Sequence, residues 1–253
     1  MMKKLVSSLM LAGALAAPMA ASAFVVGPTT PGKWGPAAFG TGATVTYSYM
    51  PTGTSCAAGE FAGCTITALG PLVGGGVSVV DWHTAIAAAF ASWSAVSDLT
   101  FVLVADDGAA FNAATTSGDM RFGAHAFDGA FGTLAHGFFP PDNGLSAAGD
   151  IHFDVGDTWK FGFGGPGFDI FQVAAHEIGH AIGLDHTLVP LSLMNASYTE
   201  AFAGPQADDI AGAVFLYGRA AAPPSGVPEP MSLALVGLAL GAVGLVRRRK
   251  QQA

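Results

Sequence analysis

Residues 176–186 read HEIGHAIGLDH, and this stretch decides how the rest of the chain is interpreted. On a helix, positions i and i+4 share one face, so His176 and His180 can offer two imidazole nitrogens to one metal ion. Gly183 can end that helix, because glycine tolerates a positive φ, and the turn brings His186 back toward the same ion. A catalytic zinc takes three protein ligands and keeps its fourth position for water. The stretch therefore predicts a catalytic zinc centre.

The length of the pattern makes this prediction specific. A bare His-Glu-x-x-His arises by chance in about one chain of this size in a hundred, and the added glycine and third histidine lower that frequency about a thousandfold. The alternative, a buried helix whose histidines are ordinary core residues, is therefore not favoured. Glu177 follows the first histidine and is the predicted general base for the metal-bound water.

The extended motif resembles that of the metzincin clan of zinc endopeptidases, and Thr187 after the third histidine is similar to the matrixin (matrix metalloproteinase) branch. Met194 resembles the methionine of the turn that lies under the zinc in this clan. Tyr198 resembles the tyrosine in the wall of the matrixin S1′ pocket, although Ala196 stands where matrixins usually have proline. The likeness extends over most of residues 42–218.

This resemblance implies an α+β fold, a metzincin-type catalytic domain in which a twisted mixed β-sheet carries an active-site helix and a C-terminal helix. Hydrophobic patterning agrees with that class. It predicts helices at 81–96, capped by Asp81, at 168–182 and at 206–216, and short strands at 44–49, 99–104, 119–122, 133–138 and 150–153.

The implied activity is hydrolysis of peptide bonds in a polypeptide substrate. By resemblance, Leu134 and Ala135 lie in the strand on the upper rim of the cleft, where an extended substrate could add main-chain hydrogen bonds. Tyr198 would then border the pocket for a substrate side chain. Two other readings stay open: a non-catalytic, metal-stabilised protein of the cell surface or extracellular matrix, and a different zinc hydrolase such as an amidase.

A second metal region is expected, because six of the seven histidines fall where a matrixin uses ligands. His125, His136 and His152 resemble the ligands of the structural zinc, whose closed site needs a fourth. Phe127 stands where the family has its aspartate. The site is therefore rebuilt with Asp128, completed by water, or lost, and the three histidines could also be solvent-facing strand residues.

A calcium site is also implied by the resemblance. Asp128, Asp154 and Asp157 are similar to the calcium-binding carboxylates of the family, and hard carboxylate oxygens suit this ion. The two predictions compete, because Asp128 cannot readily serve both zinc and calcium.

The two ends of the chain look like sorting segments. Residues 1–23 have two lysines, an apolar stretch and Ala-Ser-Ala at the end, the pattern of a cleavable secretory signal. At the other end, an apolar run over 231–246 is followed by four basic residues. The expected organisation is a signal peptide (1–23), an N-terminal segment (24–41), the protease domain (42–218), a Pro/Ala-rich linker (219–230) and a hydrophobic sorting or anchor helix (231–253).

The linker ends in Val-Pro-Glu-Pro at 227–230, and with the apolar run and basic end it resembles a PEP-CTERM sorting signal. That resemblance implies a Gram-negative bacterium, anchoring in the inner membrane before processing by an exosortase, and delivery to the cell surface or the medium. The alternative is a plain single-pass anchor.

Charge and cysteines narrow the function further. Residues 24–226 hold 4 Lys or Arg against 17 Asp or Glu, a net charge of −13, which makes nucleic acid an unsuitable partner. Cys56 and Cys64 predict a local disulfide in an exported protein, rather than free thiols. Nothing near the N-terminus resembles the cysteine switch that keeps many matrixins latent, so substrate preference and latency stay open.

Overall fold

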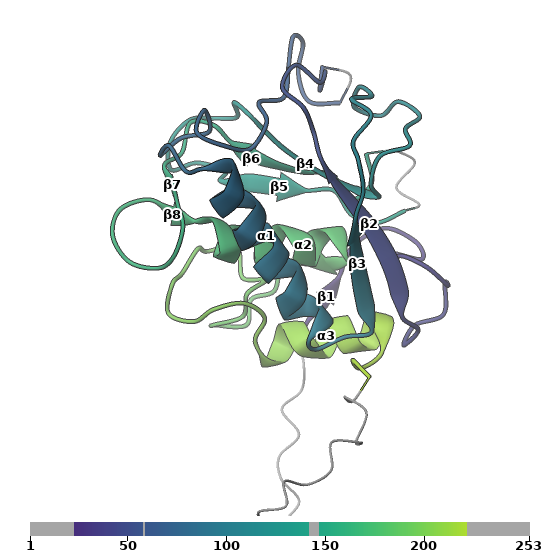
Figure 1. The fold of residues 1–253 in the computed structure, drawn as a ribbon. Helices are drawn as coiled ribbons and strands as arrows, with labels where there is room; N and C mark the ends of the chain where they lie inside the picture. Colours follow the sequence, from purple (N-terminus) through teal and green to yellow (C-terminus); the bar gives the residue numbers. More distant parts are fainter. Residues whose placement is uncertain (1–22, 58, 142–146, 222–253) are drawn as a thin grey trace, which may run out of the picture. The chain divides into compact units, whose positions relative to one another are not determined.

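The computed structural model describes residues 23–57, 59–141 and 147–221. They form an α+β fold in which a five-stranded mixed sheet is accompanied by three helices and by short two-stranded pairings (Figure 1), so the predicted fold class is confirmed. The strands are β1 (Val25–Val26), β2 (Ala43–Tyr49), β3 (Leu99–Leu103), β4 (Met120–His125), β5 (Ala135–Gly137), β6 (Ile151–Asp154), β7 (Trp159–Lys160), β8 (Phe168–Asp169) and β9 (Leu184–Asp185).

The five-stranded sheet has the order β3-β2-β4-β6-β5. The β3–β2, β2–β4 and β4–β6 pairs are parallel, and β5 runs antiparallel to β6 at the edge. Every residue of β4 and β6 is buried, as expected for the inner strands of a mostly parallel sheet. The antiparallel edge strand β5 is short and partly exposed, so its outer edge is accessible.

Two of the helices form the layer that covers the sheet. Helix α1 (Val79–Ser94) packs against α2 (Ile170–Ala181), and α2 lies along β5 and β6. The predicted cap of α1 was wrong: Ser78 caps the helix, and the Asp81 backbone N–H donates to the Ser78 hydroxyl at 3.1 Å. Helix α3 (Ala207–Tyr217) contacts β9, which follows α2 in the chain.

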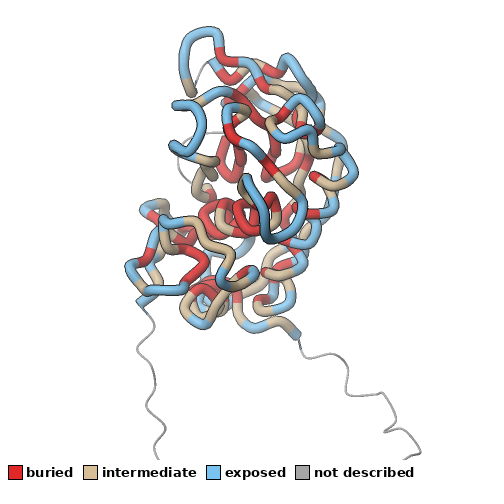
Figure 2. Tube along the Cα trace, turned by 90° about the vertical axis from the view of Figure 1, so that its left-hand side faces the viewer, coloured by how far each residue is buried: buried red, intermediate tan, exposed pale blue. Residues whose placement is uncertain are grey.

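The main core lies between the sheet and these helices, and the buried residues gather there in Figure 2. Three large aromatic side chains, Trp82, Phe153 and Trp159, contact one another with ring centroids 5.1–5.5 Å apart. A separate small cluster comprises Met50, Cys56, Cys64, Ile66, Phe111 and Ala147.

Element boundaries differ from the predictions mainly at β4, which continues to His125, and at β5, which is shorter than 133–138. The two-residue strands β1, β7, β8 and β9 were not predicted, because two residues carry no periodicity. The predicted signal, apart from Ala23, and the C-terminal apolar segment lie outside the described residues. Within the described residues, no helix is long and apolar enough to cross a membrane.

Replacing Trp82 with alanine should lower the free energy of unfolding by about 3–5 kcal/mol, because it empties a fully buried site against Phe153 and Trp159. Leu72→Ala is the matched control, since Leu72 is 80% exposed and its loss should cost less than about 0.5 kcal/mol. Denaturant unfolding of both variants measures the difference, and equal costs would contradict this placement of the core.

Candidate functional site

Helix α2 presents the first three residues of the predicted centre. The Asp169 carboxylate caps the helix by accepting from the Gln172 backbone N–H at 2.9 Å. One turn further on, His176 and His180 lie one above the other on the same face, with Glu177 beside them. The local sequence therefore sets the spacing of these side chains without help from distant contacts.

Gly183 ends the helix and returns the chain to the site. Its φ is +106°, and an added Cβ would lie 2.1 Å from the Gly32 carbonyl oxygen, so no side chain fits. The turn places the ring of His186 against both helix histidines. Its Nε2 is 3.2 Å from the Nε2 of His176 and 3.2 Å from that of His180.

These spacings fit a tetrahedral zinc. Ligands at about 2.0–2.1 Å from the ion lie about 3.3–3.4 Å from one another. Hydrogen bonds to backbone carbonyls fix the orientation of the His176 and His180 rings. The Nδ1 of His176 lies 2.7 Å from the Leu193 carbonyl oxygen, and the Nδ1 of His180 lies 2.8 Å from the Leu184 carbonyl oxygen. An Nδ1–H that donates to a carbonyl leaves the Nε2 lone pair free for a metal.

Burial keeps these two imidazoles neutral. It lowers the pKa of His176 to about 4 and that of His180 to about 3, and the hydrogen bonds to the two carbonyls only partly oppose it. Metal binding requires unprotonated imidazole, so both rings are in the binding form at neutral pH.

Glu177 lies beside the histidines in a dry environment. Burial raises the pKa of this carboxyl to about 8, partly opposed by a hydrogen bond from the Gly137 backbone N–H. A raised pKa near neutrality suits a group that accepts and returns a proton. A cation held by the histidines would favour the ionised form and lower that pKa.

The turn beneath the histidines is held by the last helix. The Met194 sulfur lies so close to Gly179 that an added Cβ there would meet it at 2.2 Å. The buried carboxylate of Asp209 accepts from the backbone N–H groups of Leu193 at 2.7 Å and Met194 at 3.0 Å, and from the Ser192 hydroxyl. Sequence reasoning placed Met194 in this turn but did not predict the role of Asp209.

A cleft of about 380 Å³ opens in front of this group. The three residues predicted to contact substrate, Leu134, Ala135 and Tyr198, all line it, together with Glu177. The Tyr198 hydroxyl donates to Glu200 at 2.6 Å and accepts from the Asp169 backbone N–H at 2.8 Å, so this wall is anchored to the start of α2. The remaining lining residues are Asp128, Gly132, Thr133, Gln172, Val173, His176, His186, Leu193, Asn195, Ala196, Ser197, Thr199 and Phe202.

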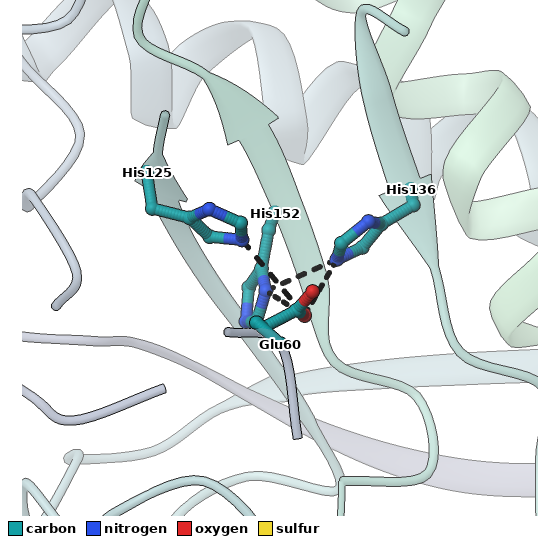
Figure 3. A group of neighbouring side chains, drawn as sticks. All are labelled: Glu60, His125, His136 and His152. Carbon is teal, nitrogen blue, oxygen red and sulfur yellow. Dashed lines mark hydrogen bonds and ion pairs between the residues drawn. The ribbon is translucent and has the colours of Figure 1, made fainter. Parts of the chain in front are cut away.

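The three histidines of the second region also meet, because the register of the sheet places them on one face. His136 on β5 pairs directly with His152 on β6. On the other edge of β6, His152 pairs with Gly123 of β4, and His125 lies two residues further along β4, so its side chain is on the same face as that of Gly123 would be. Figure 3 shows the rings converging on Glu60, which comes from a separate segment. Sequence reasoning did not include Glu60; its only local signal was its position midway between Cys56 and Cys64.

The structure differs from the expectation that Asp128 rebuilds this group. The Asp128 carboxylate accepts from the Thr133 backbone N–H at 3.0 Å and from its hydroxyl at 3.2 Å, and it does not belong to the histidine group. The carboxyl of Glu60 takes that place, 2.9 Å from His136 Nε2 and 3.1 Å from His152 Nδ1. Burial raises the pKa of Glu60, but its contacts with the three histidine rings outweigh burial and hold that pKa well below its usual range.

The remaining predicted site residues are the aspartates of the expected calcium site and the two cysteines. Asp154 and Asp157 are buried, and each has an Oδ2 without a hydrogen-bond partner among the described residues. Burial raises the pKa of Asp157, and the negative charges of Asp154 and Asp128 raise it further. Among the described residues, the three carboxylates do not form a group of ligand atoms within 4.8 Å of one another. Cys56 and Cys64 are joined in a disulfide.

Two histidines one helical turn apart, a third after a glycine turn and a buried glutamate in an open cleft define the zinc metalloendopeptidase class. The family model of the matrixins (Peptidase M10) matches residues 76–218, more than half of the chain. The chain therefore belongs to the matrixin family.

Similar proteins agree with this family. The chain is 37% identical to karilysin from Tannerella forsythia over 142 residues, which are 56% of this chain and 30% of that protein. It is 41% identical to stromelysin-3 from Xenopus laevis over 160 residues, 61% of this chain and 31% of that protein. It is 44% identical to human matrix metalloproteinase-25 over 111 residues, which are 42% of this chain and 19% of that protein. The chain thus spans about a third or less of the length of these relatives.

Asp209→Asn should lower the melting temperature by about 5–10 °C, because an amide places N–H groups against backbone donors and breaks a buried network worth about 2–3 kcal/mol. Asp208→Asn is the control at the neighbouring position, where the one hydrogen bond of the carboxylate among the described residues comes from the Ala23 backbone N–H. Differential scanning calorimetry of both variants tests this. Equal melting temperatures for the two would show that the Asp209 network does not hold the turn.

Proposed function

We propose that this protein is a zinc-dependent endopeptidase whose catalytic ion is held by His176, His180 and His186, with Glu177 as general base and Met194 as the residue beneath the site. The observation that carries the proposal is the convergence of three imidazole nitrogens within 3.2 Å contacts beside a buried carboxyl in an open cleft. The helix, the glycine turn and the backing carbonyls all orient these groups before any ion binds.

When bound, zinc lowers the pKa of a coordinated water to about 7 and polarises the scissile carbonyl. Glu177 takes the proton from the water and passes it to the leaving amine. The backbone of Gly137 lies against Glu177 and donates to its carboxylate, which orients the group toward the cleft. His176 and His180 keep their lone pairs directed at the ion through the carbonyls of Leu193 and Leu184.

The substrate we propose is an extended polypeptide. β5 is the edge strand of the sheet, and Leu134 and Ala135 at its start line the cleft, so a peptide can pair with this edge through main-chain hydrogen bonds. Tyr198, Val173 and Phe202 line the same cleft and form an apolar wall for one substrate side chain. The competing reading, a non-catalytic surface protein, leaves the buried Glu177 and the open cleft without a role.

Glu177→Gln should lower kcat/KM on a mixed peptide library by at least about a hundredfold, since the amide cannot accept the water proton. Zinc content should stay unchanged, because the three histidines are intact. The assay uses residues 24–226 with zinc and calcium, and mass spectrometry reads the cleavage products. Unchanged cleavage by the variant would exclude Glu177 as the base, and no cleavage by the zinc-loaded parent would favour the non-catalytic reading.

We further propose a second zinc at His125, His136 and His152, and a calcium ion at Asp128, Asp154 and Asp157. For the zinc, the support is the shared face of the three histidines. For the calcium, the support is the pair of unpartnered buried oxygens on Asp154 and Asp157. Both ions would stabilise the part of the sheet that borders the substrate cleft.

The proposed location is outside the cytoplasm of a Gram-negative bacterium. The signal at 1–23 would be removed on export, and the segment 231–253 would anchor the protein in the inner membrane until an exosortase acts at the PEP-CTERM signal. The disulfide between Cys56 and Cys64 supports an oxidising compartment. The linker 219–230 would separate the protease domain, 42–218, from the membrane, with 24–41 as its N-terminal segment.

In an exosortase-containing Gram-negative host, intact-mass analysis should find an exported form that starts at Phe24 and lacks the basic end. Glu229→Ala changes the Val-Pro-Glu-Pro stretch and should leave the tail attached. Pro223→Ala, in the same linker but outside that stretch, should be processed normally. An intact tail in all three proteins would favour a single-pass anchor instead.

A further inference from the structure

Glu60 lies against the three rings of the second histidine group, in the position of a fourth ligand. His136 Nε2 and His152 Nδ1 lie 3.2 Å apart, and the Glu60 Oε1 lies 2.9, 3.1 and 3.8 Å from the ring nitrogens of His136, His152 and His125. Four ligands at about 2.0–2.1 Å from a tetrahedral zinc are about 3.3–3.4 Å from one another. The four distances lie within about 0.5 Å of that spacing, and all four ligand atoms lie within 4.8 Å of one another.

His125 shows that this group is more than a set of hydrogen bonds. Its Nδ1 lies 3.0 Å from the Ala126 carbonyl and donates to it, so the Nε2 is the atom that His125 presents to the group. That Nε2 is buried, has no hydrogen-bond partner among the described residues and faces the Glu60 carboxylate at 3.8 Å. A metal cation between this ring nitrogen and the carboxylate would give both buried groups a partner.

The loop between Cys56 and Cys64 holds Glu60 in this position. Cys56 and Cys64 are joined by the disulfide, and the Glu60 backbone N–H donates to the Cys56 carbonyl at 3.0 Å. Gly59 lies against the Phe111 ring so closely that an added Cβ would be 1.7 Å from Cε1. The Phe61 ring meets the His125 ring edge-on at 5.7 Å. The loop is thus held on both sides of Glu60.

Other candidates for the fourth ligand are less suitable. The carboxylate of Asp128 accepts from Thr133 and does not belong to the histidine group. The sulfurs of Cys56 and Cys64 lie near His125 but are bonded to each other, and a disulfide sulfur is not the thiolate that binds zinc.

The Glu60 side chain is 12% exposed and that of His136 is 31% exposed, whereas His125 and His152 are almost fully buried, so the ion would enter from the His136 side.

We propose that Glu60 is the fourth ligand of the second zinc site, and that the disulfide between Cys56 and Cys64 holds it there. This proposal rests on the second zinc proposed above. Zinc then fastens the disulfide loop to β4, β5 and β6, the strands that end in or contain the three histidines. Reducing the disulfide frees the loop, so the retention of this zinc depends on the redox state of the cysteine pair.

The test measures zinc per chain and zinc release to a chromophoric chelator in the purified full chain. The parent should hold about two zinc ions, and His136→Ala about one. Glu60→Gln should weaken zinc retention at the second site about 10–100-fold. The double variant Cys56→Ser/Cys64→Ser should weaken it about tenfold, because the free loop must be ordered on binding. Glu200→Gln is the matched control and should leave zinc retention unchanged.

The outcomes separate the two proposals. If His136→Ala loses a zinc and Glu60→Gln does not, water is the fourth ligand and the role of Glu60 is overturned. If the parent holds one zinc only, the second site itself is overturned, whereas peptide cleavage would still stand on the first. Cobalt substitution of the parent gives a check on the second site that does not depend on a variant folding: intense visible bands from two four-coordinate ions support a four-coordinate second site, whether Glu60 or water is its fourth ligand, and a weakly absorbing second ion overturns it.

Discussion

The buried carboxylate of Asp209 is the interaction on which the candidate active site depends. It accepts from the Leu193 backbone N–H, and the Leu193 carbonyl in turn lies 2.7 Å from His176 Nδ1. The last helix therefore sets the orientation of a proposed metal ligand on another helix through a single turn of chain. Because Met194 of that turn packs against Gly179, a shift of α3 would be transmitted to the spacing of the histidines.

β5 connects the two metal regions. His136 belongs to the second histidine group, and its neighbour Ala135 lines the substrate cleft, while the Gly137 backbone N–H donates to Glu177. This three-residue edge strand pairs with β6 alone in the sheet, so an ion bound at His136 would restrict its motion. On this view the second zinc stabilises the substrate-binding edge and takes no part in the reaction.

Local sequence patterns predicted much of the fold and of the two histidine groups. The spacing of residues 176–186 predicted which histidines meet, because a helix has a fixed rise and a glycine turn reverses the chain within a few residues. The α+β class followed from resemblance and is confirmed by the sheet and helices. His125, His136 and His152 were singled out as a group, and the register of three strands brings them together.

The amino-acid sequence by itself determined the family, the fold class and the residues that a helix turn and its glycine bring together. Only the tertiary structure decided that Glu60 faces the second histidine group while Asp128 turns to Thr133, and that Asp209 holds the turn at Met194. The physical reason is distance along the chain: Glu60 is 65 residues from His125 and 92 from His152. No local spacing encodes such a contact, which exists because the disulfide and the ring of Phe111 place one loop against the sheet.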